Sequence, residues 1–448
     1  MRRLLMTAVV LAVLATTLAA PVATAAPVRP GPAVGNRSHG LTVTSVDALT
    51  ARTTVYRVAT TNLRQPVRIV VTLPQDYDRR RRYPVLYLMH GTGGNPTDWV
   101  LKARAEESTA KRDVIVVAPD AGYEGDGGGW FVNWWNGGRG GVPRWEDFHI
   151  DQVVPWVDAQ FPTIATRQGR AVAGASQGGF GAMHAAARHP DMFATVGSFS
   201  GAATIYRDPH TRLYAGSIIE LTTLLLDGAP PLSMFGDPFT NAVHWEGHDP
   251  GWLVDNLRHT TIDLSTGNGL PGARDDLTTC CTIASNLIEH AAHTSTHAFA
   301  RFADEAGVRY RLISRVGTHS WPYWQDDVQR FTDLAMKQFR APAARPAQIS
   351  YTSIERRWTQ WGWTVEWDRR AKEQGSTLSR AGSRGFRIAG EGTARVVTPR
   401  SYRPRSTHVV TVTSGTKAVR TSVRADASGR LAIRVPVAAG QTAAVAIR

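Results

Sequence analysis

Arg170-Ala-Val-Ala-Gly-Ala-Ser-Gln-Gly-Gly-Phe-Gly-Ala-Met-His-Ala-Ala-Ala-Arg-His189 is the stretch of sequence that decides the fold. Its first residues are apolar and predict a buried strand, whereas the residues after Gly179 are small, favour a helix and end at Pro190. Ser176 stands between them in Gly-Ala-Ser-Gln-Gly, where glycines leave room for a tight turn. The start of a helix directs backbone N–H groups toward such a serine. The pattern is typical of a nucleophile held between a strand and a helix, so we predict that Ser176 is a nucleophile.

Continuous apolar runs lie on both sides of this stretch and predict buried parallel strands. Helical periodicity over residues 148–161 and 283–306 separates several of these runs. Alternating apolar and polar residues over 41–73 predict antiparallel strands ahead of them. This order predicts an α/β fold with helices on both faces of a mostly parallel sheet, where ligands bind beyond the carboxyl ends of the strands. The predicted parallel strands are residues 83–89, 114–118, 171–173, 194–199, 261–264 and 310–313.

The first 25 residues have the three parts of a secretory signal peptide. Arg2 and Arg3 precede the apolar run 4–14, and Ala23-Thr24-Ala25 forms a cleavage site. The alternative, a membrane anchor, needs about 20 apolar residues without such a site. We therefore predict cleavage after Ala25 and a secreted, extracellular protein. The predicted organisation is a signal peptide (1–25), a flexible lead-in (26–40), a catalytic domain (41–340), a linker (341–347) and a basic accessory domain (348–448).

The accessory domain is predicted to be a small β-sandwich, because short alternating runs follow the Pro- and Ala-rich linker. The chain has a net charge of +14, and residues 341–448 hold 19 lysines and arginines against six acidic residues. This asymmetry predicts docking on an anionic cell-wall polymer or membrane surface. The alternative is a covering domain that is incidentally rich in arginine. We expect no nucleic-acid partner. The predicted strands are residues 386–389, 394–398, 408–413, 431–435 and 443–447.

The only two cysteines, Cys280 and Cys281, are adjacent and cannot join distant elements. We expect buried thiols or a strained vicinal bridge. The sequence lacks a phosphate-binding loop, a dinucleotide-binding fingerprint and the ligand spacing of a zinc site. It therefore predicts no cofactor and no metal.

A serine hydroxyl reacts only when a base takes its proton and a carboxylate orients that base. His319, in Gly317-Thr-His-Ser-Trp321, follows the last predicted strand and is the predicted base. We expect His184 and His189 to be packing or surface residues.

The predicted acid lies on the loop after the strand that ends near Gly267-Asn-Gly269. Asp275 is our first choice there and Asp276 is the alternative. Asp263 lies inside a predicted strand and Glu289 lies on the following helix, so we expect them to be capping or surface charges.

Acyl transfer also needs N–H donors for the oxyanion that forms. The backbone N–H of Gln177, directly after the nucleophile, is the first predicted donor. The glycine-rich loop His90-Gly-Thr-Gly-Gly94 supplies the second, with Thr92 preferred and Gly93 in reserve.

An aromatic segment over residues 127–138 is predicted either to line a substrate pocket or to pack on the edge of the sheet. We name Trp134 and Trp135 in this segment, with Trp321 beside the predicted base, as candidate substrate-binding residues.

The chain resembles the esterase D-like branch of the α/β hydrolases, which includes S-formylglutathione hydrolases and is related to the secreted mycolyltransferases. The resemblance covers about residues 50–340 and implies an α/β-hydrolase fold. It implies a triad of Ser176, His319 and a carboxylate after Gly269, with Thr92 and Gln177 as oxyanion donors. The matching segments are Tyr83-Pro-Val-Leu-Tyr-Leu-Met-His-Gly91, Pro143-Arg-Trp-Glu-Asp147, Gly174-Ala-Ser-Gln-Gly-Gly179, Gly267-Asn-Gly269 and Gly317-Thr-His-Ser-Trp-Pro-Tyr-Trp324.

The chain departs from the mycolyltransferases at the oxyanion loop, where it has His90-Gly91 in place of Asp-Gly. This difference favours water over a sugar as the acceptor. We therefore predict a secreted serine carboxylic-ester hydrolase that uses an acyl-enzyme. The alternatives are an acyltransferase of the mycolyltransferase type and a non-catalytic surface-binding protein on a hydrolase scaffold.

Overall fold

The computed structural model describes residues 30–123, 127–135, 143–275, 283–342 and 345–448. Among them, ten strands form one sheet in the order β1-β2-β3-β4-β6-β5-β7-β8-β9-β10. The strands from β1 to β4 pair antiparallel, as do β4 and β6, and the remaining pairs are parallel. The ten strands are β1 (Arg37–Ser38), β2 (Leu41–Ala48), β3 (Thr53–Ala59), β4 (Val67–Thr72), β5 (Val85–Met89), β6 (Ile115–Pro119), β7 (Arg170–Ala175), β8 (Thr195–Phe199), β9 (Thr261–Thr266) and β10 (Tyr310–Ser314).

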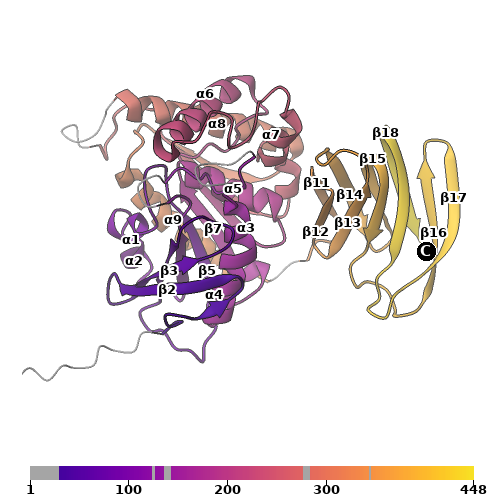
Figure 1. Cartoon of the computed structure of the whole chain (residues 1–448), viewed down its shortest axis with the longest axis horizontal. Helices are drawn as coiled ribbons and strands as arrows, with labels where there is room; N and C mark the ends of the chain where they lie inside the picture. Colours follow the sequence, from indigo (N-terminus) through magenta and orange to yellow (C-terminus); the bar gives the residue numbers. More distant parts are fainter. Residues whose placement is uncertain (1–29, 124–126, 136–142, 276–282, 343–344) are drawn as a thin grey trace, which may run out of the picture. The chain divides into compact units, whose positions relative to one another are not determined.

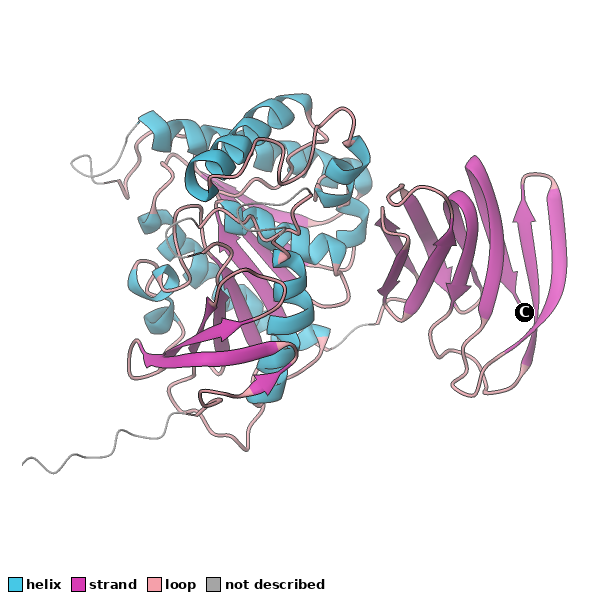
Figure 2. Cartoon of the chain, in the orientation of Figure 1, coloured by secondary structure: helices cyan, strands magenta, loops and turns pink. Residues whose placement is uncertain are grey.

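Helices and helical turns lie between these strands and cover the sheet (Figure 1, Figure 2). The predicted helices over 148–161 and 283–306 are present, the first as a π-helical turn that continues into an α-helix. The elements are α1 (Asp98–Leu101), α2 (Ala105–Ser108), α3 (Trp145–Asp147), η1 (Phe148–Val153), α4 (Val154–Gln160), η2 (Arg167–Gly169), α5 (Gln177–Arg188), α6 (Pro209–Thr222), η3 (Thr223–Asp227), α7 (Ala242–His248), η4 (Val254–Leu257), α8 (Ile283–Ala306) and α9 (Trp321–Arg340).

The two faces of the sheet carry separate apolar cores, because successive side chains of a strand point to opposite faces. Leu86 and Leu88 of β5 pack with residues of α1, α2 and α9. Tyr87 and Met89 pack with residues of η1, α4, α5 and α8. This is the predicted α/β architecture, and it brings the carboxyl ends of β5, β7, β8 and β9 to one edge. β1 already pairs with β2, so the sheet begins before residue 41.

The C-terminal strands form an antiparallel β-sandwich, as predicted. Its two long strands each join two predicted strands. β15 pairs with β14 through its first half and with β13 through its second half, with a register shift between Gly390 and Gly392. The strands are β11 (Ile349–Ser353), β12 (Arg357–Gln360), β13 (Trp363–Asp368), β14 (Ser376–Gly382), β15 (Gly385–Val397), β16 (Thr407–Ser414), β17 (Lys417–Arg424) and β18 (Ala432–Ile447).

The predicted signal peptide lies outside the described residues. Within the described part of the chain, no helix is both long and apolar enough to cross a lipid bilayer.

Candidate active site

Ser176 occupies a strained turn between β7 and α5. Its backbone has φ 58° and ψ −124°, a conformation that costs a non-glycine residue about 1–3 kcal/mol. The N–H of Ser176 donates to the carbonyl of Phe199 at the end of β8 (2.9 Å). A Cβ on Gly178 would lie 2.0 Å from the carbonyl oxygen of Met89, so only glycine lets α5 start this close to β5. The structure therefore places Ser176 on the predicted strand-turn-helix, at the carboxyl edge of the sheet.

His319 lies on the loop between β10 and α9, where its ring contacts the side chain of Glu289. The distance from His319 Nδ1 to Glu289 Oε2 is 2.6 Å. The carboxylate comes from α8 and is fully buried, whereas the side chain of His319 is 11% exposed. Trp324 packs edge-on against the imidazole, with ring centroids 5.0 Å apart. Because Nδ1 is taken by the carboxylate, Nε2 is the nitrogen left to exchange a proton.

Glu289 is fixed by three donors from the ends of neighbouring strands. Its Oε1 accepts hydrogen bonds from Ser200 Oγ (2.8 Å), the N–H of Gly267 (2.5 Å) and Thr266 Oγ1 (3.2 Å). Ser200 directly follows Phe199, the residue whose carbonyl holds the nucleophile turn. A continuous set of contacts therefore links Ser176 to Glu289 and His319.

Asp275, the predicted acid, does not contact His319. Its carboxylate accepts hydrogen bonds from the hydroxyls of Thr318, Ser320 and Tyr323 and from the N–H of Gly272. These partners flank His319, so Asp275 fixes the loop rather than the imidazole. On this geometry Glu289, and not Asp275, is the carboxylate that contacts His319 Nδ1. The alternative Asp276 lies outside the described residues, as do Cys280 and Cys281.

The periodicity of α8 is the sequence signal that marks Glu289. Positions three and four apart on a helix lie on the same face. Glu289 is a carboxylate in an otherwise small and apolar stripe of α8. A carboxylate in such a stripe points inward. Glu289 is therefore not the surface charge that we expected from the sequence. The buried stripe is Glu289, Ala292, Thr296, Phe299 and Ala303.

The glycine-rich loop after β5 lies against the nucleophile, as the oxyanion prediction requires. A Cβ on Gly91 would lie 3.4 Å from the Cβ of Ser176. Among the described residues, no backbone hydrogen bond occupies the N–H of Thr92. Gly93 has φ 69° and is exposed. Gln177 is the first residue of α5, so its N–H has no partner within the helix.

His90 fixes the base of this loop as a neutral imidazole. Its Nε2 accepts a hydrogen bond from the N–H of Ala121 (2.9 Å), so Nδ1 carries the proton and donates to the carbonyl of Gly91 (2.9 Å). Burial lowers the pKa of His90 and favours this uncharged form. The histidine that replaces the mycolyltransferase aspartate thus shapes the loop.

The side chain of Gln177 joins the nucleophile turn to the aromatic segment. Its Nε2 donates to the carbonyl of Gly127 (2.6 Å) and its Oε1 accepts from the N–H of Trp130 (3.3 Å). A Cβ on Gly127 would lie 3.2 Å from the nitrogen of Gly93, so this segment also touches the oxyanion loop. Trp130 and Phe131 both have positive φ, which marks a backbone held by its surroundings.

The three tryptophans predicted to bind substrate have other neighbours. Trp134 is 3% exposed and donates to the carbonyl of Gly129. Trp135 packs against His244 of α7, with ring centroids 4.7 Å apart. Trp321 packs against Trp99 and Trp324. The described part of the aromatic segment is therefore packed into the fold except at Trp135, which is 36% exposed. The tryptophan that touches the imidazole is Trp324.

Exposed apolar side chains gather on the elements around His319. Leu270, Ile283 and Leu287 are between 61% and 80% exposed, and the start of α8 meets the histidine loop where Ser285 Oγ donates to the carbonyl of His319. α6 contacts α8, and α6 and η3 add four exposed leucines. The exposed apolar side chains of these elements are Leu213, Leu221, Leu224, Leu225, Leu270, Ile283 and Leu287.

Known proteins resemble the chain in both sequence and fold. The Mycobacterium tuberculosis protein Esterase Rv1288 is 36% identical over 218 residues, 47% of this chain and 45% of that protein. The chain thus spans about half the length of this curated relative. The Mycobacterium leprae protein Diacylglycerol acyltransferase/mycolyltransferase Ag85A is 27% identical over 260 residues, 55% of this chain and 72% of that protein.

The crystal structure of MPT51 from Mycobacterium tuberculosis has a TM-score of 0.50 at 22% identity, and the match covers 66% of this chain and 99% of MPT51. This likeness confirms the predicted α/β-hydrolase fold. Residues 60–331, more than half of the chain, match the model of the family Esterase, described as "Putative esterase". The chain belongs to the Esterase family.

Proposed function

We propose that the protein is a secreted serine hydrolase that cleaves carboxylic esters through an acyl-enzyme on Ser176. The single observation that carries the proposal is the 2.6 Å contact between His319 Nδ1 and the buried carboxylate of Glu289, beside a strained serine turn. A carboxylate in this position keeps the proton on Nδ1 and leaves Nε2 as a base. Glu289 therefore takes the role that the sequence predicted for Asp275.

The reaction proceeds in two halves that use the same groups. Ser176 Oγ attacks the ester carbonyl carbon and gives its proton to His319 Nε2, while Glu289 stabilises the imidazolium. The N–H groups of Thr92 and Gln177 donate to the oxyanion. When the C–O bond breaks, His319 protonates the leaving alcohol. Water then loses a proton to His319 and attacks the acyl carbon, and His319 returns this proton to Ser176 Oγ as the acid product is released.

The exposed side chains of Leu270, Ile283 and Leu287, on the elements next to the His319 loop, support esters with an apolar acyl group as the substrate class. Exposed apolar patches commonly mark places where ligands or partners bind. The closely related alternative is acyl transfer, in which an alcohol replaces water in the second half. The neutral His90 in the oxyanion loop supports hydrolysis. Product analysis of a long-chain nitrophenyl ester, with and without glycerol or a disaccharide as acceptor, distinguishes the two. An acyl-acceptor product in preference to the free acid would overturn hydrolysis.

Labelling with a fluorophosphonate tests the nucleophile directly. We expect one adduct per chain, located by peptide mapping on Ser176, and no adduct in Ser176→Ala. An unlabelled wild-type protein that is shown to be folded by circular dichroism would instead support the non-catalytic alternative. A label on another serine would refute the assignment of Ser176.

The predicted signal peptide supports export. In a secreting bacterial host, the N-terminus of the protein in the medium should be Ala26. A protein that keeps residues 1–25 or stays with the cells contradicts this part of the proposal.

A row of charges on the β-sandwich supports docking on an anionic surface. Arg357, Glu366, Arg395 and Arg434 are exposed and stand opposite one another across β12, β13, β15 and β18. Arg395 and Arg434 form a like-charge pair that destabilises a bare sheet, and an anion lying over the pair removes that repulsion.

Sedimentation with anionic phosphatidylglycerol vesicles and with anionic cell-wall preparations tests this docking. We expect the double variant Arg395→Gln/Arg434→Gln to bind several-fold more weakly than the matched Arg420→Gln/Arg424→Gln, which removes the same charge from β17. Equal loss in both variants would show that net charge alone matters, and binding that is insensitive to salt would contradict an electrostatic dock.

A further inference from the structure

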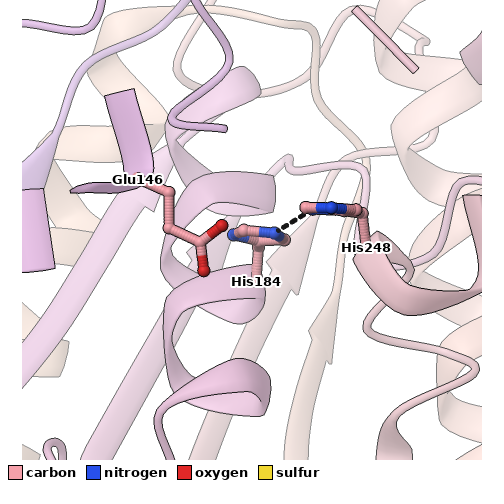
Figure 3. A group of neighbouring side chains, drawn as sticks. All are labelled: Glu146, His184 and His248. Atoms are coloured by element: carbon pink, nitrogen blue, oxygen red, sulfur yellow. Dashed lines mark hydrogen bonds between the residues drawn. The ribbon is translucent and has the colours of Figure 1, made fainter. Parts of the chain in front are cut away.

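Glu146, His184 and His248 come together in the interior, away from the catalytic contacts described above. They lie on α3, α5 and α7, are each 5% exposed or less, and each offers one ligand atom within 4.8 Å of the others. Figure 3 shows the three side chains pointing toward one another, with the His184 ring between the other two. His184 Nε2 and His248 Nδ1 are 2.9 Å apart.

The donor set is the one that zinc and similar divalent ions prefer. Imidazole nitrogens combined with one carboxylate are common ligands of Zn²⁺, whereas Mg²⁺ and Ca²⁺ prefer oxygen alone. Two neutral imidazoles that face each other across 2.9 Å share one proton. An ion of the zinc class would displace this proton and need the nitrogens to separate by only a few tenths of an ångström.

Both imidazoles are enclosed in the interior of the protein, where His184 is 1% exposed and His248 is 3% exposed.

A further histidine beside the cluster has an unused nitrogen. His244 precedes His248 by four residues on α7, the spacing that places two histidines on one helix face. Their ring centroids are 4.4 Å apart. His244 is 6% exposed, its Nδ1 contacts Glu373 Oε2 (3.1 Å), and its Nε2 is buried without a hydrogen-bond partner. His244 lies beside the group of three residues whose ligand atoms are all within 4.8 Å of one another, and is not a member of it.

The charges around the cluster leave room for a cation. Glu146 Oε1 accepts hydrogen bonds from Arg188 Nε (2.7 Å) and His189 Nε2 (2.9 Å). Arg188 is also paired with Glu355 (2.9 Å), so one guanidinium is divided between two carboxylates. Glu373 adds a third carboxylate at the His244 end.

We propose that Glu146, His184 and His248 bind one divalent ion of the zinc class. Such an ion joins α3, α5 and α7 and has a structural role. The proposal does not depend on the proposed esterase function, and its test does not use activity.

The test measures metal content in untagged, full-length protein. The protein is stripped with a chelator, incubated with Zn²⁺, passed through gel filtration and analysed by plasma mass spectrometry. We expect about one zinc per chain, and less than a tenth of that in His184→Gln and His248→Gln. The control His210→Gln removes an exposed histidine of α6 and should keep the ion. Co²⁺ in place of zinc should give the visible absorption of a tetrahedral or five-coordinate site in the wild-type protein only.

Two results would overturn the proposal. One is wild-type protein that emerges without zinc and whose melting temperature is the same with Zn²⁺ and with chelator. The other is zinc that is lost in His297→Gln but kept in His248→Gln, because His293 and His297 form a separate pair on α8. If the cluster variants fail to fold, the zinc-dependent shift of the wild-type melting temperature, expected to be several degrees upward, decides the question alone.

Discussion

Two groups in the structure place a buried glutamate beside an imidazole, yet they differ in access to solvent and in the charge of their surroundings. One is Glu289 with His319, and the other is Glu146 with His184 and His248. His319 lies at the edge of the sheet and is partly exposed. Its Nδ1 contacts the carboxylate of Glu289, which leaves Nε2 for a substrate. His184 is enclosed, with Glu146 on one side and His248 on the other (Figure 3). An imidazole can pass a proton to a substrate only where its second nitrogen is accessible. The difference in access therefore agrees with the proposed proton transfer at His319 and with a structural role for the enclosed group.

The hydrogen-bond partners of Glu289 and Glu146 also differ in charge. Glu289 receives hydrogen bonds from two hydroxyls and a backbone N–H, all neutral. Burial alone would raise the pKa of Glu146, but the charge of Arg188 and the hydrogen bond with His189 hold it well below its usual value. Glu289 is therefore held by neutral donors beside its imidazole, whereas Glu146 is paired with the guanidinium of Arg188.

Among the substitutions that distinguish the two groups, Glu289→Gln should have the largest effect on activity. An amide in this place no longer enforces the proton on Nδ1 or stabilises the imidazolium, so kcat on a short-chain nitrophenyl ester should fall by about 10³- to 10⁴-fold. Asp275→Asn is the matched control, since Asp275 contacts only the loop, and it should lose less than about tenfold. If Asp275→Asn loses as much as Glu289→Gln in folded protein, the assignment of the acid is reversed.

Glu146→Gln should act on stability rather than on chemistry. Removing this charge leaves the buried Arg188 with only the partly exposed Glu355, and breaking a buried pair typically costs about 3–5 kcal/mol. Urea unfolding in the presence of a chelator measures the loss without any contribution of bound metal. We expect kcat of the folded fraction to change by less than about threefold. A large fall of kcat at unchanged stability would make this cluster part of the catalytic site.

Gln177→Ala tests whether the proposed active site depends on the contact between Gln177 and the 127–130 segment. Gln177 begins α5, the helix that also carries His184. The variant keeps the backbone N–H but loses both side-chain hydrogen bonds to the 127–130 segment. A looser oxyanion hole should lower kcat by about 10- to 100-fold with little change in KM. The variant Gln177→Glu can accept the bond from Trp130 but cannot donate to Gly127, and it should not recover kcat. Full activity in both variants would show that the aromatic segment does not position the site.

The smallest effect is a dependence of stability on pH that comes from the enclosed histidines. The pKa is lowered by burial to about 3 for His184 and to about 4 for His149, against about 6.5 in the unfolded chain. Stability is therefore complete above pH 6.5 and falls as the pH decreases toward the folded-state pKa, because only the unfolded state binds the proton. Each such histidine contributes a slope of up to about 1.4 kcal/mol per pH unit. Urea unfolding at pH 7, 6 and 5 measures the slope. His184→Asn should reduce the slope by the contribution of one proton, up to about 1.4 kcal/mol per pH unit. A flat profile between pH 6 and pH 5 would contradict burial of neutral histidines.

Much of the catalytic domain could be predicted because its signals are local. The elbow at Ser176, the buried strands and the histidine after the last strand each follow from a few neighbouring residues. Glu289 could not be found in this way, because it reaches His319 from a helix rather than from the loop that follows β9. Only the inward face of α8 marks it, whereas proximity in the sequence favours Asp275.

The β-sandwich shows a similar limit. Its strands alternate clearly, but the segments around Gly390 and Gly440 have turn residues and predicted breaks. In the structure β15 shifts register near Gly390 and continues, and β18 continues through Gly440. Pairing with neighbouring strands therefore overrides the local preference of these glycines, and such pairing depends on residues far away in the sequence.

The backbone of Ser176 sets the proposed nucleophile against thermodynamic stability at a single residue. Its φ of 58° is unfavourable for serine and would cost glycine almost nothing. Replacing the serine by glycine would relax the fold and abolish the nucleophile at once. Selection for stability alone would therefore remove the hydroxyl. A serine on so strained a turn is expected where selection keeps the hydroxyl for its chemistry.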